Sequence, residues 1–305
     1  MEFISNFTVI LISIILEALP FILLGSLASG IIEVFVSEQF ICRILSRRGY
    51  ISMIVALFTG LILPVCECTT VPVSRRLIVK GVPFYAVVTF MVAVPQINLL
   101  TIFSSSIAFS YNIKIILIRI LTGFLISLAA GILSVFIFKE RGKDLYIEGK
   151  DENCCYSIIN HSPEEVIPLW KKIGKLMEAT IDDFFYIGFY FLTGAFCAAA
   201  VQTFFPKQIL SDMASGKILS IVLMMAASYL LCLCSEANAF IAKSFARQFP
   251  LGSVMAFMLF GPMIDLRITF MLLGALRKRV VVKLMLLIIS LNFIAALIIN
   301  FLFKR

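Results

Sequence analysis

Residues 7–35 read FTVILISIILEALPFILLGSLASGIIEVF, and this stretch decides the class of fold. A helix that crosses the hydrocarbon core of a bilayer needs about 20 largely apolar residues, and this run exceeds that length. It is too long for the core of a signal peptide, no basic segment precedes it, and no convincing cleavage site follows it. We therefore predict that it remains in the protein as a first membrane-spanning helix.

Composition extends this prediction to the whole chain of 305 residues. Hydrophobic residues make up 61% of the sequence and charged residues 14%, which lies outside the range of soluble domains. Apolar windows of spanning length recur along nearly all of it. The predicted fold class is an all-α polytopic membrane protein. We expect eight full spans, at residues 7–36, 50–65, 83–109, 112–138, 177–204, 216–233, 251–275 and 280–303.

The charge distribution sets the partners and the domain limits. The net charge is +8, but Lys and Arg fall at segment ends, where they meet lipid headgroups, so we expect the bilayer and no nucleic acid as partner. Residues 139–175 are polar and form a predicted cytoplasmic linker between a first membrane unit, 1–138, and a second, 176–305. No nucleotide-binding or zinc-protease motif occurs, so we expect neither an enzyme nor a cofactor. The oligomeric state leaves no local signature.

An internal repeat relates the two units at a constant offset of 167 residues. The matching pairs include Arg76 and Lys243, Pro83 and Pro250, Pro95 and Pro262, and Asn98 and Asp265. Four full spans in each unit would make the two repeats parallel, whereas an odd number of spans would make them inverted. Both symmetries remain open at this stage.

Each unit also contains a cysteine and acid cluster, LPVCEC at 63–68 and CLCSE at 232–236. The segments that follow, 69–80 and 237–248, are too short for a comfortable span, so we predict re-entrant half-helices. Backbone groups released at such breaks must be satisfied by protein or by a water-filled cavity. The half-helix N-termini would bring positive dipole ends to that cavity, which suits an anion or a thiolate.

The residues of these breaks are the candidate substrate site. Cysteine thiolates bind soft, thiophilic metals and metalloids, and acids at membrane depth are usually functional. Two alternatives stay open: the acids could pair with nearby Arg75, Arg76 or Lys243, and the cysteines could be packed hydrophobic residues. The predicted substrate-binding residues are Cys66, Glu67, Cys68, Cys234, Ser235, Glu236, Asn98, Asp265 and Asn238, with Cys66, Cys68 and Cys234 as ligands if a soft metal or metalloid binds.

Two further sets of residues carry weaker predictions. Glu17 and Asp183 occupy corresponding places in the two units and could titrate to couple transport to protons, although Asp183 could instead lie at the headgroup level. Asn98 and Asp265 could likewise serve only as hydrogen-bonding groups between helices. Cys154 and Cys155 in the linker could hold a soft metal as a vicinal pair or have no particular role.

The first cluster also carries a family resemblance. PVCEC at 64–68, Pro72, RRL at 75–77, KGVP at 80–83 and PQIN at 95–98 resemble the bacterial predicted-permease family that includes the organoarsenical efflux permease. The resemblance implies a multi-pass permease of the bacterial inner membrane that exports trivalent organoarsenicals. The opposing hypothesis is a thiol-disulfide redox conduit that uses one cysteine from each repeat.

Overall fold

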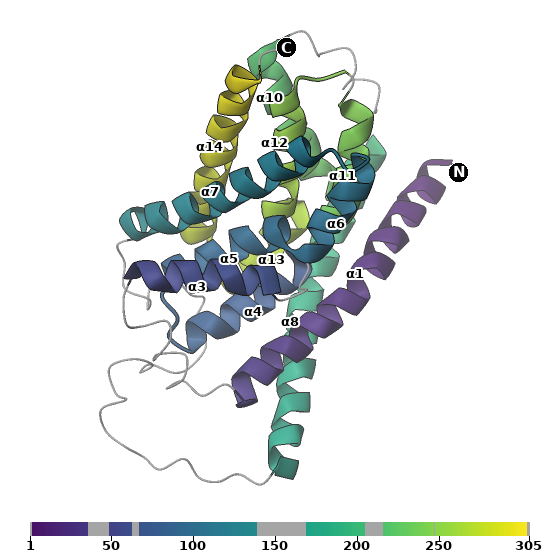
Figure 1. The fold of residues 1–305 in the computed structure, drawn as a ribbon. Coiled ribbons are helices and arrows are strands. Elements are labelled where there is room, and N and C mark those ends of the chain that lie inside the picture. The colour runs from purple at the N-terminus through teal and green to yellow at the C-terminus, as the bar shows by residue number, and fades with distance from the viewer. Residues whose placement is uncertain are drawn as a thin grey trace.

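The computed structural model describes a bundle of α-helices (Figure 1) over residues 2–35, 49–62, 67–138, 169–204, 216–246 and 248–303. All of its regular elements within these ranges are helical, so the all-α prediction is confirmed. The helices are α1 (Glu2–Phe35), α3 (Gly49–Ile62), α4 (Glu67–Val79), α5 (Phe84–Ile97), α6 (Leu99–Ala108), α7 (Ile113–Ile137), α8 (Leu169–Phe204), α10 (Lys217–Leu231), α11 (Ser235–Phe245), α12 (Leu251–Met263), α13 (Leu266–Ala275) and α14 (Lys278–Leu302).

Six helical stretches, rather than the expected eight, are long and apolar enough to cross a membrane within the described residues. They are Ile4–Ile32, Phe84–Ala108, Ile113–Ile137, Ile173–Thr203, Leu251–Ala275 and Lys278–Leu302. The other two candidates, α3 and α10, have 14 and 15 residues. At 1.5 Å per residue they reach only about 21–23 Å, against a hydrocarbon core of about 30 Å. The α10 helix ends early because Cys232 adopts a left-handed conformation, with φ of 47°.

Two of the long spans are interrupted at a polar residue that lies three positions after a proline. Proline has no backbone N–H to give to the preceding turn, which weakens the helix at Pro95 and Pro262. The chain is extended at Asn98 and Asp265, and each side chain then caps the next helix, Asn98 through the N–H of Leu100 and Asp265 through that of Ile268. The polar residue therefore stabilises the start of α6 or α13.

The α1 and α8 helices form a long antiparallel pair (Figure 1). The ring of Phe7, near the start of α1, lies 5.2 Å from the ring of Phe196, near the end of α8. At the other end of the pair, the hydroxyl of Ser29 donates to the carboxylate of Asp183, over 2.6 Å. Sequence numbers thus rise along one helix as they fall along the other.

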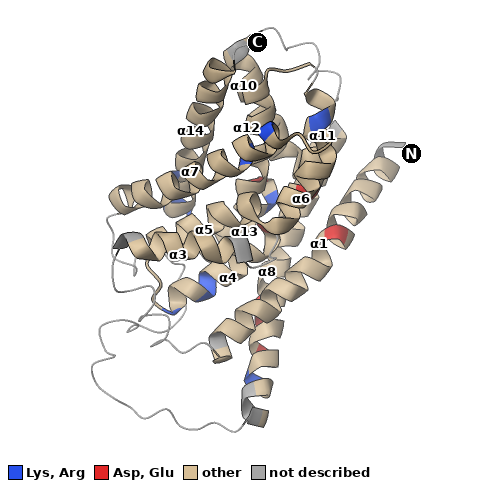
Figure 2. Ribbon diagram, in the orientation of Figure 1, with Lys and Arg blue, Asp and Glu red and all other residues tan. Residues whose placement is uncertain are grey.

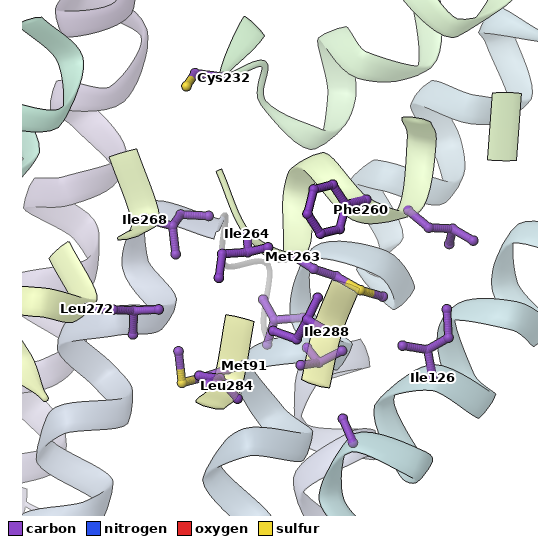
Figure 3. Close-up of a cluster of buried hydrophobic side chains, with 14 of the residues drawn as sticks. Met91, Ile126, Cys232, Phe260, Met263, Ile264, Ile268, Leu272, Leu284 and Ile288 are labelled. Atoms are coloured by element: carbon purple, nitrogen blue, oxygen red, sulfur yellow. The ribbon is translucent and has the colours of Figure 1, made fainter. Parts of the chain in front are cut away.

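The centre of the bundle is built by α5 and α12, whose side chains are almost all buried. Charged residues are sparse over the described helices (Figure 2). Figure 3 shows one buried apolar cluster in which Met91 of α5 and Ile126 of α7 lie with Phe260 of α12 and Leu284 of α14. The two halves of the sequence therefore share one core, and the site described below lies between them.

Candidate functional site

Three buried charged residues join the two halves of the chain. Glu67 is the first residue of α4, Asp265 caps α13, and Arg267 is the second residue of α13, with exposed fractions of 1%, 0% and 2%. Nη2 of Arg267 lies 3.3 Å from Oε1 of Glu67 and 2.8 Å from Oδ2 of Asp265. One guanidinium therefore serves two carboxylates, which come from opposite halves of the sequence.

The two carboxylates are held unequally. Asp265 accepts from Nε and Nη2 of Arg267 through Oδ2, and from the backbone N–H of Ile268 through Oδ1 at 2.7 Å. Glu67 has the single contact with Arg267, and among the described residues its Oε2 has no hydrogen-bond partner. A buried carboxylate oxygen without a donor is costly. Glu67 is thus the member of the cluster that can accept a proton or a donor group from a solute.

Thiols flank this charge cluster. Cys68 is buried beside Glu67 on α4, and Cys234 caps α11, where its sulfur accepts from the N–H of Ala237 at 3.4 Å. Both thiols lie near enough to Glu67 to interact with its charge. Cys232 donates its thiol to the carbonyl of Tyr229, at 3.3 Å, and lies beside Asp265 and Arg267. Both cysteines of the second cluster therefore border the charge cluster, Cys234 near Glu67 and Cys232 near Asp265 and Arg267.

The predicted soft-metal site remains a prediction. Within the described residues, no group of three or more His, Cys, Asp or Glu side chains could hold a metal ion. No cysteine in these ranges forms a disulfide either. Cys66, the remaining candidate ligand, lies in residues 63–66, outside the described part of the chain, as do Cys154 and Cys155.

The second cluster contributes buried polar groups from α11. Ser235 and Asn238 are buried, and the amide of Asn238 donates to the carbonyl of Phe257 at 3.1 Å. Glu236 is half-buried, and its backbone carbonyl accepts from the hydroxyl of Ser104 on α6. The second cluster thus contacts helices of both halves, α12 through the side chain of Asn238 and α6 through the backbone carbonyl of Glu236.

The sequence prediction missed two arginines and a glutamine. Arg119 of α7 is 1% exposed, donates to the hydroxyl of Ser105, and points Nη2 toward the carbonyl of Met258 at 3.5 Å. That carbonyl is one to which Pro262 cannot donate. Gln96 of α5 donates to the neighbouring carbonyl of Leu259 at 2.7 Å. The sequence did contain a signal for the two arginines: Arg119 and Arg267 both lie inside predicted spans, where a charged side chain is costly.

Asp183 and Glu17 lie in different surroundings. Asp183 is buried on α8 and accepts from Nε and Nη2 of Arg76, at 2.9 and 3.0 Å, and from Ser29. The guanidinium of Arg75 lies over the ring of Tyr186, 4.5 Å from its centre. The arginines after the first cluster therefore pair with α8, whereas Glu67 pairs with Arg267.

Glu17 is exposed on α1, and its carboxyl contacts the thiol of Cys234. Glu17 is thus the one coupling candidate that reaches the cysteine cluster. A proton-coupling role for either residue stays a prediction.

Comparison with known proteins supports a membrane transporter. The sequence model of the ArsP_1 family, described as "Predicted permease", matches residues 3–301. The UPF0718 protein YcgR of Bacillus subtilis is 39% identical over 272 residues, 89% of each chain. A "Putative two-component membrane permease complex subunit" of Streptococcus mutans is 32% identical over 274 residues, 90% of this chain and 88% of that one. No solved structure was found to match.

These matches confirm the family resemblance predicted from the first cluster. With the six candidate spans, they identify a multi-pass bacterial membrane protein. They also point to a transporter rather than an enzyme.

Proposed function

We propose that this chain, which belongs to the ArsP_1 family of predicted permeases, exports thiophilic solutes such as trivalent organoarsenicals across the bacterial cell membrane. The observation that carries the proposal is the buried Glu67–Arg267–Asp265 cluster, with the thiols of Cys68 and Cys234 beside it. Ionisable groups inside a membrane bundle usually mark the path of a solute or an ion.

The chemistry of the solute fits these groups. Trivalent arsenic is soft and exchanges oxygen ligands for sulfur, so methylarsenite and two thiols give a dithiolate and two molecules of water. Cys66 and Cys68 of the first cluster and Cys234 of the second could supply the sulfurs. Glu67, with one oxygen lacking a donor among the described residues, could take up and return the protons that move during this exchange.

We also propose that the halves are inverted repeats around this site. Helices α1 and α8 begin 167 residues apart, at Glu2 and Leu169, as do α6 and α13, at Leu99 and Leu266. Within the described residues each half has three candidate spans, an odd number, which corresponds to inversion. The antiparallel course of α1 and α8 supports the same symmetry, because these helices occupy equivalent positions in the two halves. Inverted repeats are a common basis for alternating access.

The test is resistance to methylarsenite in a bacterial strain that lacks its own organoarsenical exporters. The intact chain should confer resistance, and everted membrane vesicles should accumulate methylarsenite. The Cys66→Ser/Cys68→Ser variant should lose both activities, whereas Cys197→Ser, which changes a half-buried thiol of α8, should keep them. Equal resistance from the double variant would refute binding by these thiols, and a wild-type chain that confers none would refute the arsenical cargo.

A partner subunit is a further part of the proposal. The relative from Streptococcus mutans is named as a subunit of a permease complex. We propose that this chain also works with a second membrane protein. Purification of the tagged chain from its native membrane in a mild detergent should then recover one co-purifying protein in constant ratio; recovery of the chain by itself would contradict this.

A further inference from the structure

An ion-pair network fixes the α1–α8 pair to one side of the bundle. Asp183 of α8 binds the guanidinium of Arg76 of α4 through two hydrogen bonds and accepts a third from Ser29 of α1. We call these three residues the first lock. They bring one helix of the first half, α4, against both long helices of the pair.

Close packing holds the pair on that same side. A Cβ atom placed on Gly25 of α1 would lie 2.6 Å from Cβ of Thr69 on α4, so the two helices are nearly in backbone contact there. On α8, the hydroxyl of Tyr186 donates to the carbonyl of Gly274 at the end of α13, at 2.7 Å. The pair thus rests on α4 and α13.

The opposite side of the bundle carries matching charges that do not meet. Glu17 of α1 stands 166 residues before Asp183, and Lys243 of α11 stands 167 residues after Arg76. Both Glu17 and Lys243 are exposed. Lys243 lies 5.3 Å from the ring centre of Phe109, and no described carboxylate lies within ion-pair distance of it. The residues of a second lock are present, but they are apart.

We propose that Glu17 and Lys243 form an ion pair in a second conformation, in which the α1–α8 pair rests on α11 and α6 and the first lock is open. The proposal rests on the inverted-repeat permease described above, because exchanging the roles of the two repeats exchanges the two locks. Glu17 now lies at Cys234, and Lys243 lies about nine residues farther along α11, about 13 Å at the helical rise. The pair must therefore tilt or slide along α11 to close the second lock.

The exchange of locks gives each of the two states an ion pair of its own. Separating Asp183 from α4 would remove Arg76 and also Arg75, whose Nη1 lies 3.8 Å from its Oδ1, and would leave a buried carboxylate without a counter-ion, which is costly. Forming Glu17–Lys243 at the same time offsets part of that cost. Two alternative packings with their own ion pairs are the usual form of a bistable element.

Disulfide trapping tests the proposal without a transport substrate. In a full-length chain whose native cysteines are replaced by alanine, Glu17→Cys/Lys243→Cys should cross-link on oxidation in membranes, and Arg76→Cys/Asp183→Cys should cross-link as well. Glu17→Cys/Lys283→Cys is the control that should not, because Lys283 belongs to α14, which lies on the other side of the bundle from α1 (Figure 1). Gel filtration in detergent checks that each variant is folded.

The decisive measurement is the coupling between the locks. Adding Asp183→Asn should raise the rate of the 17–243 cross-link about fivefold or more, because it removes the ion pair that holds the other state. No 17–243 cross-link, under conditions where the 76–183 pair reacts, would overturn the proposal, and so would a rate that Asp183→Asn leaves unchanged. Cross-links in a chain that moves no methylarsenite would instead refute only the cargo.

Discussion

Replacement of Arg267 by methionine should be among the most destabilising single changes in this protein. The variant keeps the approximate length of the side chain but leaves Glu67 and Asp265 buried, adjacent and without a counter-charge. Removing one partner of a buried ion pair typically costs about 3–5 kcal/mol. We expect a loss of that size in the free energy of unfolding, which would leave little folded protein in detergent.

The contact geometry predicts a rank order for the three members of the cluster. Asp265 accepts three hydrogen bonds, two from Arg267 and one from the N–H of Ile268, so Asp265→Asn should cost about 2–4 kcal/mol. Glu67 makes a single 3.3 Å contact, so Glu67→Gln should cost about 1 kcal/mol or less. The order of destabilisation is therefore Arg267→Met, then Asp265→Asn, then Glu67→Gln.

The assay is unfolding in mixed micelles of a mild detergent and sodium dodecyl sulfate, followed by tryptophan or tyrosine fluorescence. Lys278→Met serves as the control, because Lys278 is exposed at the start of α14 and a surface change there should stay within about 0.5 kcal/mol. Our reasoning is refuted if Arg267→Met unfolds at the same detergent fraction as Lys278→Met, or if Glu67→Gln costs more than Asp265→Asn.

Three other predictions concern packing, capping and redox state. Gly25→Ala should lower the free energy of unfolding in the same assay by about 1–3 kcal/mol through a clash with α4, whereas Gly174→Ala, with open space around it, should not. Asn98→Ala should cost about 1 kcal/mol by removing the cap of α6, and full stability in that variant would argue against the cap. Alkylation of intact cells should find Cys66 and Cys234 as thiols whether or not thioredoxin-type proteins are present; redox cycling would favour the thiol-disulfide conduit over the permease.

The parts of the fold that follow local rules were predictable from sequence. Apolar length gave the helical membrane class and the long spans. The two segments wrongly counted as full spans, 50–65 and 216–233, correspond to α3 and α10, which have only 14 and 15 residues. The end of α10 was predicted to within two residues, but the left-handed conformation of Cys232 that ends the helix leaves no trace in an apolar window.

The partners of the charged residues could not be predicted, because they depend on packing between distant segments. Glu67 is buried, as expected for an acid at membrane depth, but its counter-ion is Arg267, 200 positions away, and not the arginines just after it. Arg75 and Arg76 turn to α8 because Asp183 and Tyr186 meet them there. The spacing of a motif determines which side chains share one face of a helix. The tertiary structure determines which other helix packs against that face.

The pairing of charges across the two halves has a consequence for biosynthesis. A ribosome that has delivered residues up to 138 into the membrane has inserted Glu67 and Arg76, but neither Arg267 nor Asp183 yet exists to neutralise them. Until the second half is synthesised, the charges of the first half must therefore stay hydrated or be shielded by the insertion machinery. We expect a chain that stops in the segment 139–168 to be cleared by membrane proteases, because it lacks Arg267 and Asp183, the residues that pair with Glu67 and Arg76 in the folded protein.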